Sequence, residues 1–190
     1  MKTLVVARYN EDIDWLREIT GWSFTVYNKG PNIDATCTSL SNIGREANTY
    51  LTHIVNNYDN LSDYTAFVQG DPFPHAPNII EELNEFVYCS ESSEFLWFKK
   101  GGHEDLDDKN YFICDTFARP HAYYDLKLFG KTNNIIVPDQ VCFAPGAQFI
   151  VKKQTIQRRS KEFYSDLLCN IGNNEAYIME RLWKYVFLPI

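Results

Sequence analysis

The sequence lacks the features that mark membrane, secreted and zinc-binding proteins. It has no apolar run long enough to cross a bilayer, and no secretory hydrophobic region follows Met1. Its five cysteines are scattered, and no C-x-x-C pair occurs among them. An odd, dispersed set favours reduced thiols over a disulfide framework or a zinc site. Internal repeats, low-complexity tracts and linkers are also missing. These absences predict one soluble domain in a cytoplasmic setting.

Positive charge is also scarce. The chain has 18 Lys and Arg residues against 25 Asp and Glu residues, a net charge of −7 at pH 7. A nucleic-acid surface needs a basic face, so we expect no nucleic-acid partner. A nucleotide is not excluded, because it needs only a local positive pocket. With 190 residues, of which 45% are hydrophobic, the chain is long and apolar enough to bury a full core.

The patterning predicts strands that alternate with helices. The apolar run Thr3–Ala7 indicates a buried strand, a helix follows over Ile13–Ile19, and Ser23–Tyr27 alternates as a second strand. This order is typical of βαβ nucleotide-binding architecture. We leave Tyr111–Phe129 unassigned and expect a mobile loop at Lys99–Asn110. The other expected elements are strands Ala66–Val68, Glu94–Phe98, Gln140–Phe143 and Ala147–Val151, and helices after Arg45 and over Ile79–Phe86, Thr155–Leu168 and Glu175–Phe187.

The stretch Tyr64–His75 combines a strand with an abrupt polar exit. Because Pro72 and Pro74 cannot donate to a sheet ladder, the strand should stop at or near Asp71. Asp71 then lies at the carboxyl end of a strand, where open α/β sheets bind their ligands. Asp71 and His75 suit a hard or borderline divalent metal. Alone, the stretch also fits an ordinary strand exit with a solvated Asp.

Polar groups follow the predicted strands at four places. These are Arg8–Glu11, Asn28–Lys29, Asn42–Arg45 and Gln69–Asp71. In a doubly wound sheet such ends converge on one crevice. Arg45 lies where a loop enters a helix, so its guanidinium and the nearby backbone N–H groups suit phosphate oxygens. Each basic residue singly also fits a solvated surface position, but their common placement at strand or loop ends favours an anion pocket.

The order of these motifs resembles the GT-A fold of nucleotide-sugar glycosyltransferases. That family opens with a strand leading to a Y-N-E-type segment, then has an N-x-G loop before a helix and a D-x-D motif after a strand. Val5–Glu11 matches the first and Asn42–Gly44 the second, while Gln69–Asp71 occupies the D-x-D place with Gln as its first residue. Gly146–Val151 and the helix Glu175–Trp183 resemble the region that closes the acceptor side.

The resemblance covers most of the chain and implies a Rossmann-related single domain. Its central sheet would be mixed, mostly parallel and flanked by helices, with residues 1–98 as the nucleotide-binding part and residues 99–190 as the acceptor-side part. The motif combination is also similar to small uncharacterised GT-A-like proteins and to a small glycosyltransferase domain of chlorella viruses. A viral chain of this kind would act in the host cytoplasm.

The resemblance implies a UDP-sugar donor and a glycan or protein-glycan acceptor, with Mn²⁺ or Mg²⁺ to neutralise the leaving diphosphate. Asp71 matches the second D-x-D acid and firmer metal ligand, and His121 or His75 is the candidate third ligand. Gln69 puts tight metal binding in doubt. Tyr123 and Trp183 are the candidates for sugar stacking. The implied nucleotide-binding residues are Ala7, Arg8, Tyr9, Asn28, Lys29, Asn42, Arg45, Gln69, Gly70 and Asp71.

An inverting transferase needs a base to deprotonate the acceptor hydroxyl. Glu175 and Glu180 are the candidates, and their spacing puts them on nearly opposite sides of the last helix. A retaining mechanism, which needs no such base, stays open. Two other functions stay open as well. One is a sugar nucleotidyltransferase, although such enzymes use a Gly-rich phosphate loop and the segment Tyr9–Glu11 is not one. The other is a catalytically inactive carbohydrate- or nucleotide-binding module of the same fold.

Overall fold

The structure is a computed structural model that describes residues 1–31, 36–86, 94–98, 112–115 and 120–189. At 112–115 and 120–125 it describes the backbone alone. The loop expected at 99–110 lies outside the described residues. Within these ranges, no helix combines the length and the apolar character needed to span a bilayer.

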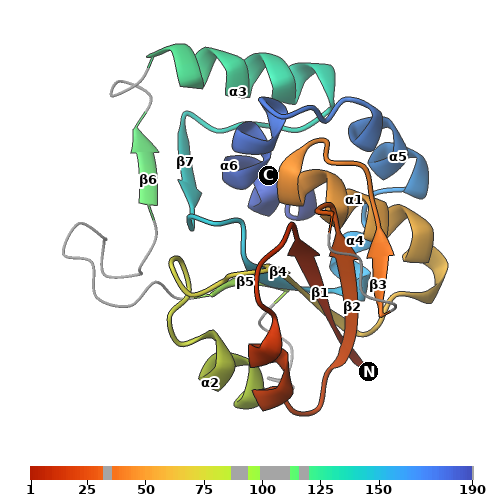
Figure 1. The fold of residues 1–190 in the computed structure, drawn as a ribbon. Helices are drawn as coiled ribbons and strands as arrows, with labels where there is room; N and C mark the ends of the chain where they lie inside the picture. Colours follow the sequence, from red (N-terminus) through yellow and green to blue (C-terminus); the bar gives the residue numbers. More distant parts are fainter. Residues whose placement is uncertain (32–35, 87–93, 99–111, 116–119, 190) are drawn as a thin grey trace.

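Six strands form one mixed sheet in the order β3-β2-β1-β4-β8-β5 (Figure 1). Parallel pairing joins β3, β2, β1 and β4, whereas β8 runs antiparallel to both β4 and β5. The predicted α/β class with a mixed, mostly parallel sheet is therefore confirmed. The strands are β1 (Lys2–Arg8), β2 (Ser23–Asn28), β3 (Cys37–Ser39), β4 (Tyr64–Gln69), β5 (Phe95–Trp97) and β8 (Phe149–Lys152).

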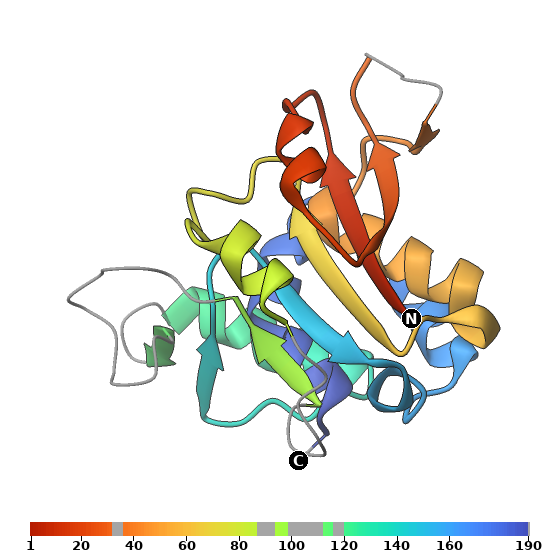
Figure 2. The same ribbon diagram turned by 90° about the horizontal axis from the view of Figure 1, so that it is seen from below.

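Helices cover both faces of this sheet. Alternate strand residues point to opposite faces, so each face has apolar side chains that pack against its own helices. Val5 and Phe67 pack toward α1 (Arg45–Asn57), α5 (Lys161–Cys169) and α6 (Glu175–Phe187). Leu4 and Val68 pack toward the 3-10 helix Asp14–Glu18 and α2 (Ile79–Asn84), which lie on the face seen in Figure 2. A second, two-stranded sheet of β6 (Phe112–Asp115) and β7 (Gln140–Phe143) lies beside α6 and α3 (Pro120–Thr132).

An aromatic cluster joins α1 and α6 to the sheet. Phe149 of β8 is fully buried, with its ring centroid 5.9 Å from Tyr50, 5.3 Å from Trp183 and 5.6 Å from Phe187. Trp183 is itself fully buried. The expectation that Trp183 stacks on a sugar is therefore wrong, since its ring packs against other core aromatics. The side chain of Tyr123, the other stacking candidate, lies outside the described residues.

Several predicted elements differ in the structure. The helix expected over Ile13–Ile19 is a five-residue 3-10 helix, Asp14–Glu18. The helix expected over Thr155–Leu168 is broken into α4 (Lys153–Ile156) and α5. The break has a local cause: Ser160 adopts an extended conformation, and its hydroxyl accepts a hydrogen bond from the N–H of Phe163, which starts a new helix. The strands β3 and β6 and the helix α3 were not expected.

The sheet order creates a crevice between β1 and β4. From β1 the chain continues to β2 and β3 on one side, whereas β4 lies on the other side. Ala7 and Gln69 are direct partners at the carboxyl ends of the two strands, and the Gly70 N–H donates to the Ala7 carbonyl at 2.9 Å. Such a reversal of strand order is where open α/β sheets bind ligands.

Burial of His53 predicts acid-sensitive stability. His53 is 5% exposed, and burial lowers its pKa to about 4 from an ordinary 6.5. Because folding disfavours the charged imidazole, its contribution to stability is complete above pH 6.5 and is lost as the pH falls toward 4. We expect about 2 kcal/mol of unfolding free energy to be lost between pH 7.5 and pH 5 through this residue. Urea unfolding at the two pH values measures the loss.

The variant His53→Gln is the comparison, since it cannot titrate in this range. It should lose less stability than the wild type over the same interval, by the amount that His53 contributes. Equal losses in the two proteins would contradict the assignment.

Candidate functional site

A cavity of about 340 Å³ opens where β1, β2 and β4 end and α1 begins. We call it the strand-end cavity. Eight of the ten residues predicted to bind nucleotide line it, so four segments far apart in the sequence do meet there. The lining residues are Ala7, Arg8, Tyr9, Glu11, Lys29, Asn42, Arg45, Glu46, Thr49, Gln69 and Asp71. Whether these residues hold a nucleotide stays a prediction.

The other two predicted residues, Asn28 and Gly70, are not among those that line the cavity. Asn28 is fully buried; its amide nitrogen donates to the Gly30 carbonyl at 2.9 Å, and its amide oxygen lies 3.5 Å from the Arg8 guanidinium. Gly70 accepts a hydrogen bond from the Trp15 indole at 2.9 Å. Both residues therefore make hydrogen bonds within the protein at the strand ends and do not line the cavity.

Glu11 organises the loop that follows β1. One carboxylate oxygen accepts from the backbone N–H groups of Tyr9 and Asn10, and the Glu11 carbonyl accepts from the Arg8 guanidinium at 2.8 Å. These bonds shape the loop from which Tyr9, 48% exposed, projects at the cavity. The sequence marked Glu11 only as part of the Y-N-E segment, and its contacts show that its carboxylate satisfies the loop's own donors.

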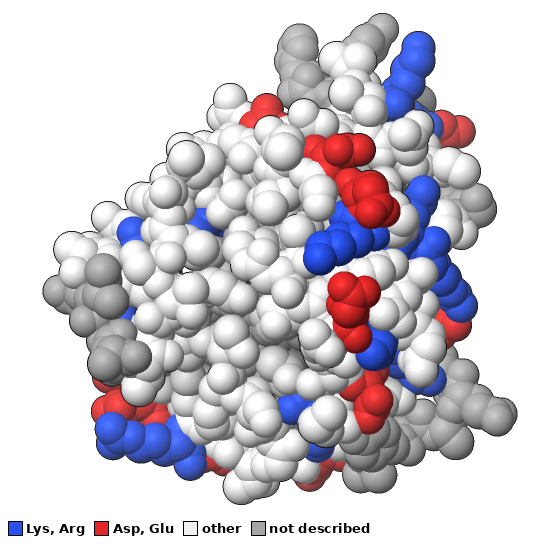
Figure 3. Space-filling view, turned by 90° about the vertical axis from the view of Figure 1, so that its right-hand side faces the viewer, with Lys and Arg blue, Asp and Glu red and all other residues white. Residues whose placement is uncertain are grey.

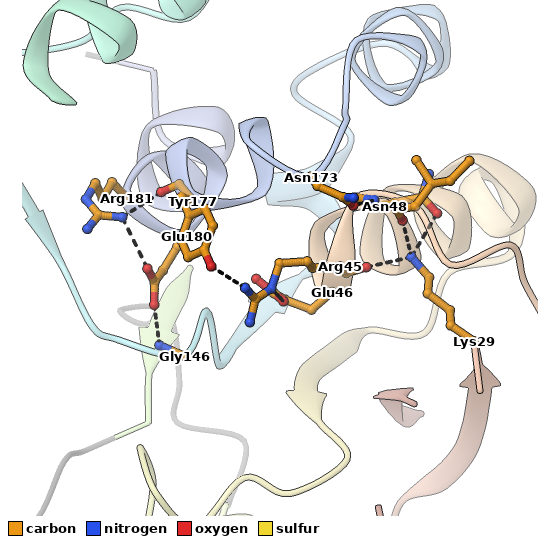
Figure 4. Close-up of polar contacts among 11 residues, drawn as sticks. Lys29, Arg45, Glu46, Asn48, Gly146, Asn173, Tyr177, Glu180 and Arg181 are labelled. Carbon is orange, nitrogen blue, oxygen red and sulfur yellow. Dashed lines mark hydrogen bonds and ion pairs between the residues drawn. The ribbon is translucent and has the colours of Figure 1, made fainter. Parts of the chain in front are cut away.

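Lys29 joins the end of β2 to the start of α1. Its ammonium donates to the carbonyls of Ile43 and Arg45, both at 2.6 Å, and to the Asn48 amide oxygen at 3.1 Å (Figure 4). Burial lowers the pKa of Lys29 to about 8, while the nearby Glu46 carboxylate acts in the opposite direction. The ammonium is thus a positive charge held in place at the cavity by three oxygens.

Arg45 is held on the opposite side of the first turn of α1. Its guanidinium donates to the Tyr177 hydroxyl and lies 4.9 Å from the centre of that ring (Figure 4). The preceding Gly44 has a left-handed φ of 65°, and its N–H donates to the Asn173 amide oxygen at 2.9 Å. That N–H is therefore already used by the protein, whereas Asn42, Arg45 and Glu46 of this segment line the cavity.

Of the two predicted metal ligands whose side chains are described, Asp71 lines the cavity and His75 does not. Asp71 is exposed, and its carboxylate accepts from the Phe73 N–H at 3.3 Å. His75 packs instead beneath Gly146, where a Cβ on the glycine would come within 2.7 Å of the His75 Cβ. The His121 side chain is not described. Among the described residues, no group of three His, Cys, Asp or Glu side chains is arranged to hold a metal ion.

This donor set fits an ion that is shared with a bound diphosphate. Mg²⁺ commonly takes one or two carboxylates and completes its shell with substrate phosphates and water. Asp71 supplies one carboxylate, and the Gln69 side chain beside it is uncharged. The residues therefore suit a metal bound together with a phosphate-bearing substrate rather than a preformed site of three protein ligands.

The two predicted bases lie outside the strand-end cavity. Glu175 accepts from the Gly172 N–H at 3.0 Å and lines a separate cavity of about 610 Å³ between α3 and α6. Glu180 accepts from the Gly146 N–H at 2.7 Å and from the Arg181 guanidinium at 3.2 Å (Figure 4). Their carboxylates are thus engaged by other parts of the protein, Glu175 at the start of its own helix and Glu180 at the loop before β8.

Glu46 is a lining residue to which the sequence analysis gave no role. Its side chain is 12% exposed and lies 3.8 Å from the Arg45 guanidinium. Burial raises the pKa of Glu46; a hydrogen bond from its own backbone N–H, Arg45 and Lys29 oppose this shift, and Glu180 adds to it. In the sequence, the three-residue spacing between Glu46 and Thr49 indicated that the two side chains share one face of the helix. Their burial together at a cavity required the tertiary structure.

Acidic and basic side chains are mixed on the face of the molecule shown in Figure 3. Blue and red groups adjoin one another there and do not separate into a broad basic patch. The absence of a nucleic-acid partner stays a prediction from the net charge of −7.

A methyl group at Gly70 should disturb the cavity wall. A Cβ at this position would lie 2.7 Å from a Glu11 carboxylate oxygen and 3.1 Å from the Glu11 Cβ. Gly70→Ala should therefore displace Glu11, weaken the loop after β1 and cost about 1–3 kcal/mol of unfolding free energy. Urea denaturation measures the cost. In a Glu11→Ala background the same substitution should cost clearly less, and an unchanged cost would show that Glu11 is not the cause.

One protein-family model matches the chain, over residues 4–87; its description is a protein of unknown function (DUF3431). No curated protein and no solved structure matches the chain. The matched range contains β1 to β4 and all the residues that line the strand-end cavity. The chain is thus similar to this family over the part of the fold that builds the cavity.

Proposed function

We propose that the protein is a GT-A-type glycosyltransferase that moves a sugar from a UDP-linked donor to a glycan or protein-glycan acceptor. One observation carries this proposal: Arg8, Lys29, Arg45 and Asp71 converge on one cavity at the reversal of strand order between β1 and β4. The three cations suit a diphosphate, and the exposed Asp71 carboxylate suits a divalent ion shared with it; Glu11 and Glu46 also line the cavity.

The lining residues divide into groups with different chemistry. Arg8 and the half-exposed ring of Tyr9 would receive the base and ribose at the end of β1. Lys29 and Arg45 would face the diphosphate, because both present positive charge that protein contacts hold in place. Such fixed charges stabilise a developing anion without reorganising during the reaction.

Asp71 would hold Mn²⁺ or Mg²⁺ together with diphosphate oxygens. When bound, the ion neutralises charge that develops on the leaving diphosphate. Gln69 offers an amide where the family pattern has an acid, so it donates or accepts a hydrogen bond but adds no negative charge. Lys29 and Arg45 therefore carry a larger share of the charge neutralisation than they would beside two acids.

An inactive carbohydrate- or nucleotide-binding module of the same fold is the second candidate. It is favoured by Gln69 at the first D-x-D position and by the lack, among the described residues, of a three-ligand metal group. Release of free UDP from UDP-sugars separates the two functions, because a binding module shows affinity without turnover.

Binding of UDP with Mn²⁺ should raise the melting temperature, because a ligand that binds only the folded state stabilises it. At about 100 times the Kd we expect a rise of about 5–10 °C by thermal shift. Asp71→Ala should remove the metal-dependent part of this rise. Asp166→Ala, which removes an exposed carboxylate from α5, is the matched control and should leave it intact. Unchanged melting curves with UDP, GDP and CDP in the presence of metal would contradict the proposed function.

UDP affinity should fall as the pH rises through about 8. The pKa of Lys29 in the folded protein is about 8, so below this pH the side chain is cationic and attracts the diphosphate, and above it the attraction is lost. We expect up to about a tenfold weaker Kd at pH 9 than at pH 7, measured by calorimetry. The terminal phosphate of UDP is already ionised over this range.

The variant Lys29→Met tests the source of this pH dependence. It should bind UDP more weakly at pH 7 and should show a flatter response between pH 7 and pH 9. The same steep dependence in the variant and the wild type would assign the titration to another group.

A further inference from the structure

Resting on the proposed function, we propose that Glu46 is the base that takes the proton from the acceptor hydroxyl. Glu46 lines the strand-end cavity together with Arg45 and Asp71, and its side chain is 12% exposed. Neither Glu175 nor Glu180 is among the residues of the cavity wall. Glu46 therefore fills a role that the sequence analysis assigned to the last helix.

The position of Glu46 suits contact with an acceptor. It lies in the first turn of α1, on the side that faces Glu180 and Tyr177 of α6 (Figure 4). The loop after β1, with Arg8 and Tyr9, supplies another part of the cavity wall. A donor held by that loop and by the cations would leave Glu46 between the reacting sugar and the C-terminal part of the chain.

Four charged or titratable groups set the electrostatics of Glu46. Arg45 belongs to the same turn, Lys29 comes from the end of β2, Glu180 comes from α6, and the Tyr50 hydroxyl lies one turn further along α1. Burial and Glu180 raise the pKa of Glu46, which makes its carboxylate a stronger proton acceptor. Arg45 and Lys29 act in the opposite direction and favour the ionised form that a base requires.

Thr49 is a second polar residue in the cavity wall beside Glu46. It lines the cavity and is fully buried, and its hydroxyl has no hydrogen-bond partner among the described residues. Thr49 follows Glu46 by three positions, so both side chains lie on one face of α1.

The chemical step is a single displacement. The acceptor oxygen forms a bond to the anomeric carbon of the donor sugar while its proton passes to the Glu46 carboxylate. The bond from the anomeric carbon to the diphosphate oxygen breaks, and its electron pair leaves on UDP. The configuration at the anomeric carbon is inverted. With water as the acceptor, the same step yields the free sugar and UDP.

The test measures UDP release from UDP-glucose, UDP-galactose and UDP-N-acetylglucosamine with Mn²⁺ and water as the acceptor. Glu46→Gln should lower kcat by about 10²- to 10⁴-fold, while the KM for the donor and the thermal shift with UDP stay close to wild type. The fall of kcat at acid pH in the wild type should disappear in the variant. Glu162→Gln, which changes a first-turn glutamate of α5, is the matched control and should behave as wild type.

Other outcomes overturn the assignment in distinguishable ways. A raised KM with unchanged kcat in Glu46→Gln would make Glu46 a donor-binding residue and leave the transferase function standing. A product with retained anomeric configuration, seen by NMR, would also exclude this base. If wild type binds UDP but releases none from any donor, or does not bind UDP, the proposed function fails and the assignment fails with it. Should Glu46→Gln not fold, Glu46→Asp replaces it, with partial activity expected and full activity contradicting the role.

Discussion

The parallel pairing of β1 with β4 is the constraint on which the rest of the molecule depends. It places Ala7 beside Gln69 and leaves the loops that follow them at one edge of the sheet. Because β2 lies on the far side of β1, the loops after β1 and β4 diverge and leave a cavity between them. Gly70 allows the Glu11 side chain to pack against the end of β4, because a methyl group at this position would collide with the Glu11 carboxylate.

The aromatic core determines what else reaches that cavity. Tyr50, Phe149 and Trp183 hold α1 and α6 against the sheet, and large-to-small changes at such core aromatics typically cost about 3–5 kcal/mol. The first turn of α1 is thereby fixed over the strand ends, with Arg45 and Glu46 at the cavity wall. Three basic and three acidic side chains line the cavity, and Lys29 and Arg45 are held there by neutral oxygens as well as by one carboxylate.

Much of the cavity could be predicted from local patterns. The apolar run before Arg8 and the prolines after Asp71 stop two strands, and polar residues at strand ends of an α/β sheet converge. The boundaries of α6, Glu175–Phe187, also agree with its helical periodicity. Glu46 and Trp183 were not predictable in the same way. Both belong to amphipathic helices, and helical periodicity does not determine whether a given side chain lines a cavity or packs against another helix.

The sequence by itself determined the α/β class, the strand ends that carry charge and the position of Asp71 beyond β4. These follow from apolar periodicity and from proline chemistry, which act over a few residues. Only the tertiary structure decided that Glu46 lines the cavity, that Glu180 is engaged by Gly146 and that Trp183 is buried. The physical reason is that burial and charge environment depend on which elements pack together, and those elements come from separate parts of the chain: Gly146 lies 34 residues before Glu180, and Trp183 packs against Tyr50 of α1.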